Sequence, residues 1–321
     1  MKSNDFPLSV ILLTHNQSDI LSVQVVALER QEDIRATEFE VIVTDDSSRV
    51  KELEKIEEIL AETNLSCHLV RQMSDRFWAA RARNNAINAS KGRLLLFLDG
   101  DMIPEVDLLS RHLLAHMGRT NHIVAGNRLR RRFGFQGNNF GQILELCRNS
   151  SSSDPDIIRW QQDEERKREG FLQSANSWRA VFGCHFSVNA TPDVIFDESF
   201  KGWGPEDAEF AYRLALRHGY SVEYAQDIKA YEVDNLGQGV ANVFRLRTQQ
   251  AIVDYLRNTI YFFDKCPCQR LEDVFQGLRK LELRDGEWFI TPADKECDLK
   301  QRIVQAREWL AINGHYELAT K

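Results

Sequence analysis

The sequence of 321 residues contains no run of about 18 apolar residues that could cross a membrane. Its first residues, MKSNDFPLSV, lack the apolar core of a secretory signal peptide. The six cysteines are scattered, and Cys266-Pro267-Cys268 is spaced too tightly for the usual zinc motifs, so reduced thiols are expected. Acidic residues outnumber basic ones, and the net charge of -7 argues against non-specific binding to nucleic acid. We therefore expect a cytoplasmic protein that is at most peripheral to a membrane.

Short apolar runs alternate with segments of helical periodicity in the first part of the chain. The pattern predicts strands at residues 8–13, 39–44, 67–70, 94–98 and 122–126, and helices at residues 18–31, 50–62, 79–89 and 105–117. Strands joined by helices of this length form right-handed crossovers, so the fold class is α/β with a largely parallel, doubly wound sheet. Such sheets bind ligands at the carboxyl ends of their strands, where this sequence places polar residues.

The most informative of these strand ends is Asp99-Gly100-Asp101, which follows the apolar run Leu94–Leu98. Alternate side chains of an extended chain share a face, so both carboxylates can point at one place, and Gly100 adds no bulk between them. Two neighbouring carboxylates repel each other unless a cation joins them. A hard divalent ion that arrives with a phosphorylated ligand is one interpretation. A surface turn capped by the two acids is the alternative that this motif alone leaves open.

The middle of the sequence, at about residues 127–180, shows no clear period and is predicted to be an irregular insertion. It begins with a local basic cluster, formed by Arg128, Arg130, Arg131 and Arg132. The mixed charges of residues 163–169 favour a solvated helix face, and a mobile cover for a second substrate is the alternative. Beyond the insertion, Cys184-His185 could suggest a thiol nucleophile. Adjacent residues of a strand face opposite ways, however, so we interpret this pair as part of the core.

A second informative stretch reads Gly202-Trp203-Gly204-Pro205-Glu206-Asp207. Pro205 suits the first turn of a helix that stops at Gly219, so Glu206 and Asp207 lie in that turn. Complementing the helix dipole would account for the two acids, at about 0.3–1 kcal/mol each. It does not account for the glycines, which allow close backbone approach, or for a Trp ring that suits the apolar face of a sugar. The stretch therefore indicates a binding edge with an adjacent base.

Five motifs occur in one order along the chain. They are Thr14-His15-Asn16 after the first strand, Val43-Thr44-Asp45-Asp46-Ser47, Arg81-Ala82-Arg83-Asn84, Leu98-Asp99-Gly100-Asp101 and Gly202-Trp203-Gly204-Pro205-Glu206-Asp207. Together they resemble a nucleotide-sugar glycosyltransferase of the GT-A fold, family 2 in type. The last motif is similar to that of the galactosyltransferase and chondroitin-polymerase group. The resemblance covers roughly residues 7–235 and implies a Rossmann-like, mostly parallel sheet with flanking helices and a C-terminal helical appendage.

The resemblance also implies roles for individual residues. The nucleotide-sugar would be bound by Thr14, Asn16, Asp45, Asp46, Arg76, Arg83, Asp99 and Gly100, with Asp46 at the acid most often used for the base. The metal, Mn²⁺ or Mg²⁺, would be held by Asp101 and Asp99. The acceptor would be bound by Trp203, Gly204 and Glu206. Asp207 would be the catalytic base, with Glu206 beside it.

The chemistry of a single displacement agrees with these roles. The acceptor hydroxyl must lose a proton while the UDP oxygen leaves from the opposite face of the sugar. Asp207 and Asp101 would serve these two sides, and the predicted outcome is inversion. Related enzymes often supply a His as a further metal ligand, whereas the corresponding region here reads Ile228–Asp234 without one. Glu232 is the predicted substitute, and the alternatives are Asp234 or a site completed by water and the diphosphate.

Residues 1–240 are predicted to form the catalytic domain and residues 241–321 a helical extension. Helical spacing is present from Val243 to Ile260, and further helices are predicted near residues 269–281 and 297–312. The extension would pack against the sheet or form a small appendage. Homodimer formation, or docking of a protein, lipid-linked or polymer acceptor, is the alternative.

Three functions compete at this point. A metal-dependent inverting glycosyltransferase would move a sugar from a UDP-sugar to the hydroxyl of a saccharide, glycan or other acceptor. A non-catalytic, carbohydrate- or nucleotide-binding relic of the same fold is the alternative. A dinucleotide oxidoreductase would need a Gly-rich turn after its first strand, and Thr14-His15-Asn16-Gln17-Ser18 contains no glycine.

Overall fold

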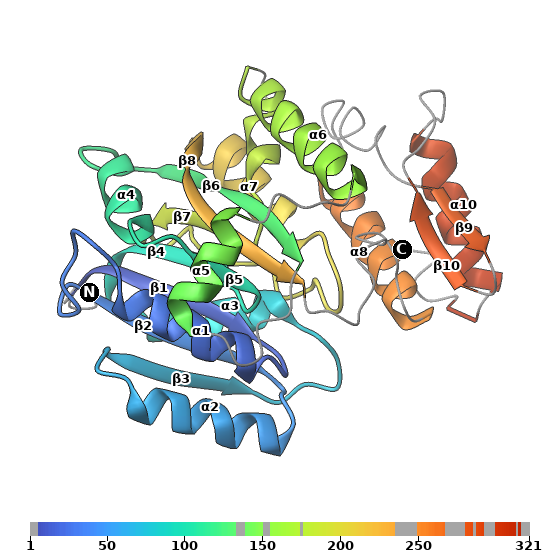
Figure 1. The fold of residues 1–321 in the computed structure, drawn as a ribbon. Helices are drawn as coiled ribbons and strands as arrows, with labels where there is room; N and C mark the ends of the chain where they lie inside the picture. Colours follow the sequence, from blue (N-terminus) through green and yellow to red (C-terminus); the bar gives the residue numbers. More distant parts are fainter. Residues whose placement is uncertain are drawn as a thin grey trace.

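The computed structural model describes residues 6–132, 139–149, 155–173, 176–234, 249–266, 280–284, 287–291, 299–312 and 314–315. Its centre is an eight-stranded sheet with strand order β3-β2-β1-β4-β7-β6-β8-β5 (Figure 1). The strands are β1 (Phe6–Thr14), β2 (Phe39–Asp46), β3 (Cys67–Gln72), β4 (Gly92–Asp99), β5 (Met102–Pro104), β6 (His122–Arg132), β7 (His185–Asn189) and β8 (Ser221–Asp234). Strands β1 to β4 run parallel, whereas β7 is antiparallel to both β4 and β6. The predicted α/β class with a mostly parallel sheet is confirmed.

The first half of the chain forms the expected crossovers. Its helices are α1 (Ser18–Glu29), α2 (Val50–Glu62), α3 (Ala79–Ala89) and α4 (Leu108–Ala115), each close to its predicted span. The short strand β5 was not predicted. It pairs antiparallel with β8, and because it directly follows the Asp99-Gly100-Asp101 turn, it ties that turn to the far edge of the sheet.

The prediction of an irregular segment at residues 127–180 is wrong for the part that the structure describes. Strand β6 continues through the basic cluster to Arg132, in parallel register with β8. It is followed by α5 (Phe140–Asn149), α6 (Pro155–Leu172) and the short 3₁₀ helix η1 (Ser177–Ala180). Strand β6 tolerates its arginines because β8 places Glu232 beside Arg130.

Helix α6 carries the mixed-charge run, and its predicted solvated face needs one correction. Arg166, Lys167 and Glu169 are exposed, but Arg168 is 1% exposed. The Arg168 guanidinium stacks over the Phe182 ring at 3.9 Å and donates a hydrogen bond to the Gly126 carbonyl at 3.0 Å. A planar, weakly hydrated guanidinium can be buried on aromatic faces in this way, so α6 is anchored to β6.

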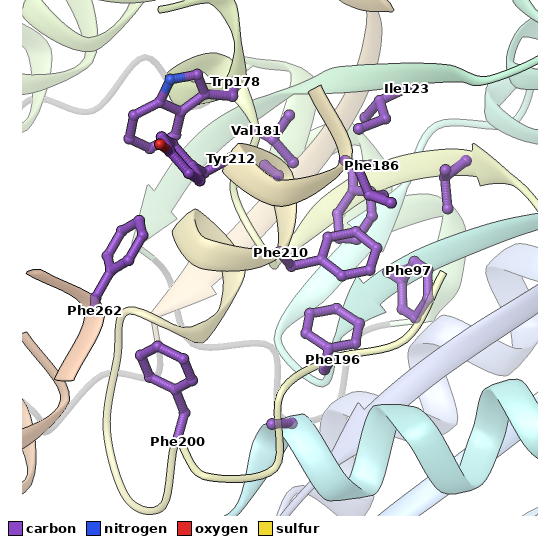
Figure 2. Packing of buried hydrophobic residues seen from close by; sticks show 14 of the residues in the cluster. Phe97, Ile123, Trp178, Val181, Phe186, Phe196, Phe200, Phe210, Tyr212 and Phe262 are labelled. Carbon is purple, nitrogen blue, oxygen red and sulfur yellow. The ribbon is translucent and has the colours of Figure 1, made fainter. Parts of the chain in front are cut away.

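The core lies on both faces of the sheet, as the alternation along β4 requires. Leu95 and Phe97 join one apolar cluster, while Leu94, Leu96 and Leu98 join the cluster on the other face. In the first cluster, aromatic rings from strand, loop and helix pack together, as Figure 2 shows for Phe97, Phe186, Phe196 and Phe210. The Phe196 and Phe210 rings stack at 4.1 Å, and the rings of Phe97 and Phe186 stack at 4.7 Å.

The C-terminal part contributes to this same core. Helix α8 (Gln249–Lys265) buries Val253, Leu256, Ile260 and Phe262 in the first cluster, and Phe262 meets Trp178 and Tyr212 edge-on (Figure 2). The part of the chain predicted as an extension is therefore joined to the sheet through α8.

Beyond α8, strands β9 (Lys280–Arg284) and β10 (Glu287–Thr291) pair antiparallel, and α10 (Leu299–Ile312) follows them in the chain. The predicted helix near 297–312 is confirmed. The helix predicted near 269–281 is wrong at residues 280–281, which lie in β9, and residues 269–279 lie outside the described part. Ile312 and Val304 of α10 are exposed, and homodimer formation through the C-terminal helices stays a prediction. Within the described ranges, no helix combines the length and the apolar character needed to span a membrane.

Candidate active site

The Asp99-Gly100-Asp101 turn lies at the carboxyl end of β4 and is held by its neighbours. Gln24 of α1 donates hydrogen bonds to the carbonyls of Asp99, at 2.8 Å, and Met102, at 2.6 Å. A Cβ atom at Gly100 would lie 2.7 Å from the carbonyl oxygen of Leu13, so only glycine fits against the end of β1. These contacts hold the turn against α1 and the end of β1.

Asp101 lies among charges of both signs. Surrounding atoms shield its carboxyl from water and, together with repulsion from Glu232 and Asp99, raise its pKa to about 8, while Arg128 and Arg130 oppose the shift. A cation beside this carboxyl would relieve the repulsion among the three acids. The oxygen-only donor set suits Mg²⁺ or Mn²⁺.

Glu232 has partners that compete with the predicted role of metal ligand. Its Oε2 atom lies 2.9 Å from Nε of Arg130 and 3.3 Å from Nε of Arg128. In the described part of the chain, no group of three or more His, Cys, Asp or Glu side chains is arranged to hold a metal ion. Oxygens from a bound diphosphate would have to complete the coordination, as is common for Mg²⁺. The assignments of Glu232, Asp99 and Asp101 as ligands stay predictions.

Arg83 of α3 joins the two acidic motifs. Its Nη2 atom lies 2.9 Å from Asp99 Oδ1, and its Nη1 atom lies 2.9 Å from Glu206 Oε1 at the start of α7 (Glu206–Arg217). The Arg83 side chain is 3% exposed and also lies over the Phe196 ring. Burial and Asp207 raise the pKa of Glu206 to about 6, with Arg83 opposing the shift. One buried cation thus fixes the end of β4 against the start of α7.

Asp207 is held next to this ion pair by backbone amides. Its Oδ2 atom accepts a hydrogen bond from the Gly183 amide at 2.8 Å, and its Oδ1 atom accepts one from the Ala208 amide at 2.7 Å. A Cβ atom at Gly183 would lie 3.0 Å from Arg83 Nη2 and 3.1 Å from Asp207 Cβ. Glycine therefore lets this loop approach both side chains closely. Gly183 is not recognisable as a site residue from the sequence alone, because only the fold brings it to Asp207.

The two loops predicted to hold the nucleotide support each other. The Asn16 amide donates to Ser48 Oγ at 2.7 Å, and the Arg49 amide donates to Asn16 Oδ1 at 2.9 Å. Asn16 and Ser47 both adopt positive φ, at 54° and 64°, which is unusual outside glycine. Two polar loops at the ends of adjacent parallel strands are thereby fixed side by side.

The polar side chains of these loops differ in whether their hydrogen-bonding groups already have partners within the protein. Asp46 is 1% exposed and accepts hydrogen bonds from Gln72 Nε2 and the Trp78 amide, both at 2.6 Å. Asp45 is also buried and accepts from the Ser48 amide. Thr14 is 1% exposed, and its hydroxyl has no hydrogen-bond partner among the described residues. The unmet hydrogen bond of Thr14 is enclosed by protein, so a ligand could reach it only if neighbouring atoms moved. The nucleotide-binding roles of all these residues stay predictions.

Arg76 and the Gly202-Trp203-Gly204 loop lie near α8. Arg76 Nη1 is 3.7 Å from Asp254 Oδ1, and the Trp203 ring, on a residue that is 38% exposed, lies 5.3 Å from the Tyr255 ring. Asp254 and Tyr255 are residues that sequence reasoning missed. Helical spacing predicted the helix, but nothing in a single sequence pairs it with a loop fifty residues earlier.

Cys184 and His185 are core residues, as predicted. Burial raises the pKa of the Cys184 thiol to about 12 and lowers the pKa of His185 to about 3. His185 Nε2 is hydrogen-bonded to His112 Nε2 at 3.0 Å, and His112 is linked through the Ser187 hydroxyl to His116. This buried polar chain lies between α4 and β7 and was not predicted.

Comparisons with known proteins identify the family and the fold of this chain. The family model described as "Glycosyl transferase family 2" matches residues 9–186. The hyaluronan synthase of Pasteurella multocida is 29% identical over 72% of this chain, and the chondroitin synthase of Escherichia coli is 26% identical over 72%. The aligned parts make up 25% and 35% of those two proteins, so this chain matches a quarter to about a third of their length. The crystal structure of GalNAc-T7 with UDP, GalNAc and Mn²⁺ has a TM-score of 0.58 at 15% identity. The match covers 85% of this chain and 50% of that chain and shows a shared fold.

Proposed function

This chain belongs to glycosyl transferase family 2, and we propose that it transfers a sugar from a UDP-sugar to a hydroxyl of a saccharide acceptor. The observation that carries the proposal is the Arg83 bridge, which joins Asp99 of the donor motif to Glu206 of the acceptor motif. Two relatives named as synthases of hyaluronan and chondroitin, and a structural neighbour crystallised with UDP and Mn²⁺, support this class of reaction.

The donor half lies at the carboxyl ends of β1, β2 and β4. Thr14 and the adjoining loops would bind the nucleoside, and Asp101 with Asp99 would hold a divalent cation beside the diphosphate. When bound, such a cation supplies Lewis-acid stabilisation of the departing UDP. The chain's own part is to keep the Asp99-Gly100-Asp101 turn rigid through Gln24, so that the carboxylates need not reorganise during the reaction.

The acceptor half lies at the start of α7. Two backbone amides fix the Asp207 carboxylate, and a carboxylate has further lone pairs that can accept the proton of an acceptor hydroxyl. Asp207 would act as general base on the face opposite the leaving UDP, and the anomeric configuration would invert. Glu206 Oε1 is engaged by Arg83, so its contribution would be to align Asp207 and the donor turn.

The test is a transfer assay on the full chain with several UDP-sugars, Mn²⁺ and a panel of β-linked disaccharides comprising cellobiose, lactose and chitobiose. Release of UDP and formation of product are both measured. Asp207→Asn should lower turnover by about 10²–10⁴-fold, the usual contribution of a general base, and change UDP affinity less than twofold. Glu54→Gln, an exposed change on α2, is the control and should match the unmodified chain. Unchanged turnover in Asp207→Asn would remove the base assignment.

The cation is tested separately by binding. Mn²⁺ titrated in the presence of UDP should bind saturably to the unmodified chain and much more weakly to Asp101→Ala. Equal binding by both proteins would place the ion elsewhere. A chain that binds UDP with Mn²⁺ but releases UDP from no donor would support the non-catalytic alternative.

A further inference from the structure

Asn258, a buried side chain of α8, contacts the backbone of the Gly202-Trp203-Gly204 loop, and the neighbouring Arg257 also donates to the Lys201 carbonyl. Asn258 is fully buried, and its Nδ2 atom donates to the carbonyl oxygens of Lys201 at 3.0 Å, Trp203 at 3.3 Å and Gly204 at 2.6 Å. Its Oδ1 atom accepts from Nη2 of the neighbouring Arg257 at 2.8 Å. The three loop partners are all acceptors, so they face the Nδ2 amino group of Asn258, whose two N–H bonds are shared among them.

The loop needs such support because its conformation is irregular. Gly202 and Gly204 both adopt left-handed φ, at 75° and 52°. A Cβ atom at Gly202 would overlap the Asp254 carboxylate of α8, so the loop is pressed directly against this helix. Outside regular secondary structure, buried carbonyl groups must find donors elsewhere, and here Asn258 supplies them.

The Trp203 ring is supported by the same helix. Tyr255, three residues before Asn258, is 9% exposed, and its ring meets that of Trp203 at a tilt of 39°. Residues three apart lie on one face of a helix, so Tyr255 and Asn258 act on the same loop. Helix α8 is itself fixed in the core through Val253 and Phe262.

We propose that Asn258 and Tyr255 are positioning residues that hold Trp203 as a stacking platform for the apolar face of a saccharide acceptor. The inference rests on the proposed function. The loop runs through Pro205 into Asp207, but Asp207 has its own anchor in the Gly183 amide. Loosening the platform should therefore impair acceptor binding while leaving the base and the donor half in place.

The first experiment observes the platform without any substrate. The full chain is labelled with 5-fluorotryptophan, and the ¹⁹F resonance of Trp203 is assigned with Trp203→Phe. We expect this resonance to shift and broaden in Asn258→Ala and Tyr255→Leu. It should stay as in the unmodified chain in Tyr255→Phe, which keeps the ring. Ile260→Ala is the matched control, since it opens a cavity under α8 but leaves the three loop hydrogen bonds intact.

The second experiment measures function with the disaccharide that accepts best in the transfer assay. Asn258→Ala and Tyr255→Leu should raise the acceptor KM at least tenfold. The rate at which the UDP-sugar is hydrolysed in the absence of acceptor should stay within twofold of that of the unmodified chain. Ile260→Ala should change neither the acceptor KM nor the rate of UDP release, although it lowers the stability of the fold. An unchanged Trp203 resonance, or equal losses in transfer and in UDP release, would overturn the proposal. A chain without any turnover would overturn the proposed function, while the resonance would still decide whether α8 fixes the ring.

Discussion

Replacing Arg83 with methionine tests whether one buried cation holds the two halves of the site together. Arg83 makes two charge-assisted contacts of 2.9 Å, to Asp99 and Glu206. The Asp99 side chain is 33% exposed and can be rehydrated, but that of Glu206 is 11% exposed and would remain buried without a partner. Removing one member of a buried pair costs about 3–5 kcal/mol. We expect the free energy of unfolding to fall by about this amount at neutral pH, and sugar transfer to be lost.

The pH dependence of this loss follows from Glu206. Burial already raises the pKa of Glu206 to about 6, above its ordinary value, and Arg83 is the cation that opposes the rise. Without Arg83 the pKa must rise further. A carboxyl whose pKa is raised by folding contributes fully to the free energy of unfolding below its unfolded pKa of 4.5. That contribution is lost as the pH rises through the folded pKa. The Arg83→Met variant should therefore be closer to the unmodified chain at pH 5 than at pH 8.

Urea denaturation at pH 5 and pH 8, followed by tryptophan fluorescence, provides the measurement. The double variant Arg83→Met/Glu206→Gln should recover about 2–3 kcal/mol relative to Arg83→Met at pH 8, because the unpaired charge is gone. Arg83→Lys keeps the charge but loses the planar guanidinium that reaches both carboxylates. Its free energy of unfolding should therefore lie between those of Arg83→Met and the unmodified chain. Strictly additive losses and a flat pH profile would refute the bridging role.

Two further predictions concern the fold around the site. Burial lowers the pKa of His116 to about 4 and of His185 to about 3, both below the ordinary value of 6.5, so stability is intact above pH 6.5 and is lost as the pH falls. Between pH 7.5 and pH 4.5 the free energy of unfolding of the unmodified chain should fall by on the order of 5 kcal/mol more than that of His116→Gln/His185→Gln in urea titrations. The raised pKa values of Asp101 and Glu206 oppose this loss equally in both proteins, so equal pH profiles of the two would contradict the prediction. Gly126→Ala would put a methyl group onto the buried His185 ring and should cost about 1–3 kcal/mol, whereas the open helical site Gly170 should gain stability from the same change. Thermal melts of the two variants decide this, and equal melting temperatures would exclude the clash.

The elements that local patterns specify were predictable. Along β4 the residues alternate between the two core clusters, and a strand buried on both faces is recognisable as a continuous apolar run. Each such run ends in polar residues, and parallel strands bring those ends to one edge of the sheet. That rule placed Asp45 and Asp99 at the same edge, as the structure does.

The parts that were not predicted depend on partners far away in the sequence. The local sequence around Arg130 indicates a loop, but in the fold Arg130 lies in a strand next to Glu232 of β8. The local sequence around Arg168 indicates a solvated side chain, but in the fold the rings of Phe182 and Tyr224 cover its guanidinium. Likewise, the order of residues does not indicate that Asn258 meets the carbonyl of Gly204. Such pairings are tertiary contacts, and local propensity carries no information about them.

The same partners explain why the acids around the donor turn are not equivalent. Arg83 neutralises Asp99 from one side, and Arg128 and Arg130 neutralise Glu232 from the other. Asp101 is left between them, and burial, with repulsion from Glu232 and Asp99, raises its pKa to about 8 despite the opposing Arg128 and Arg130. A cation held here by few protein oxygens would need the diphosphate to complete its coordination. Metal and nucleotide should then bind with positive coupling, since each supplies part of the other's site.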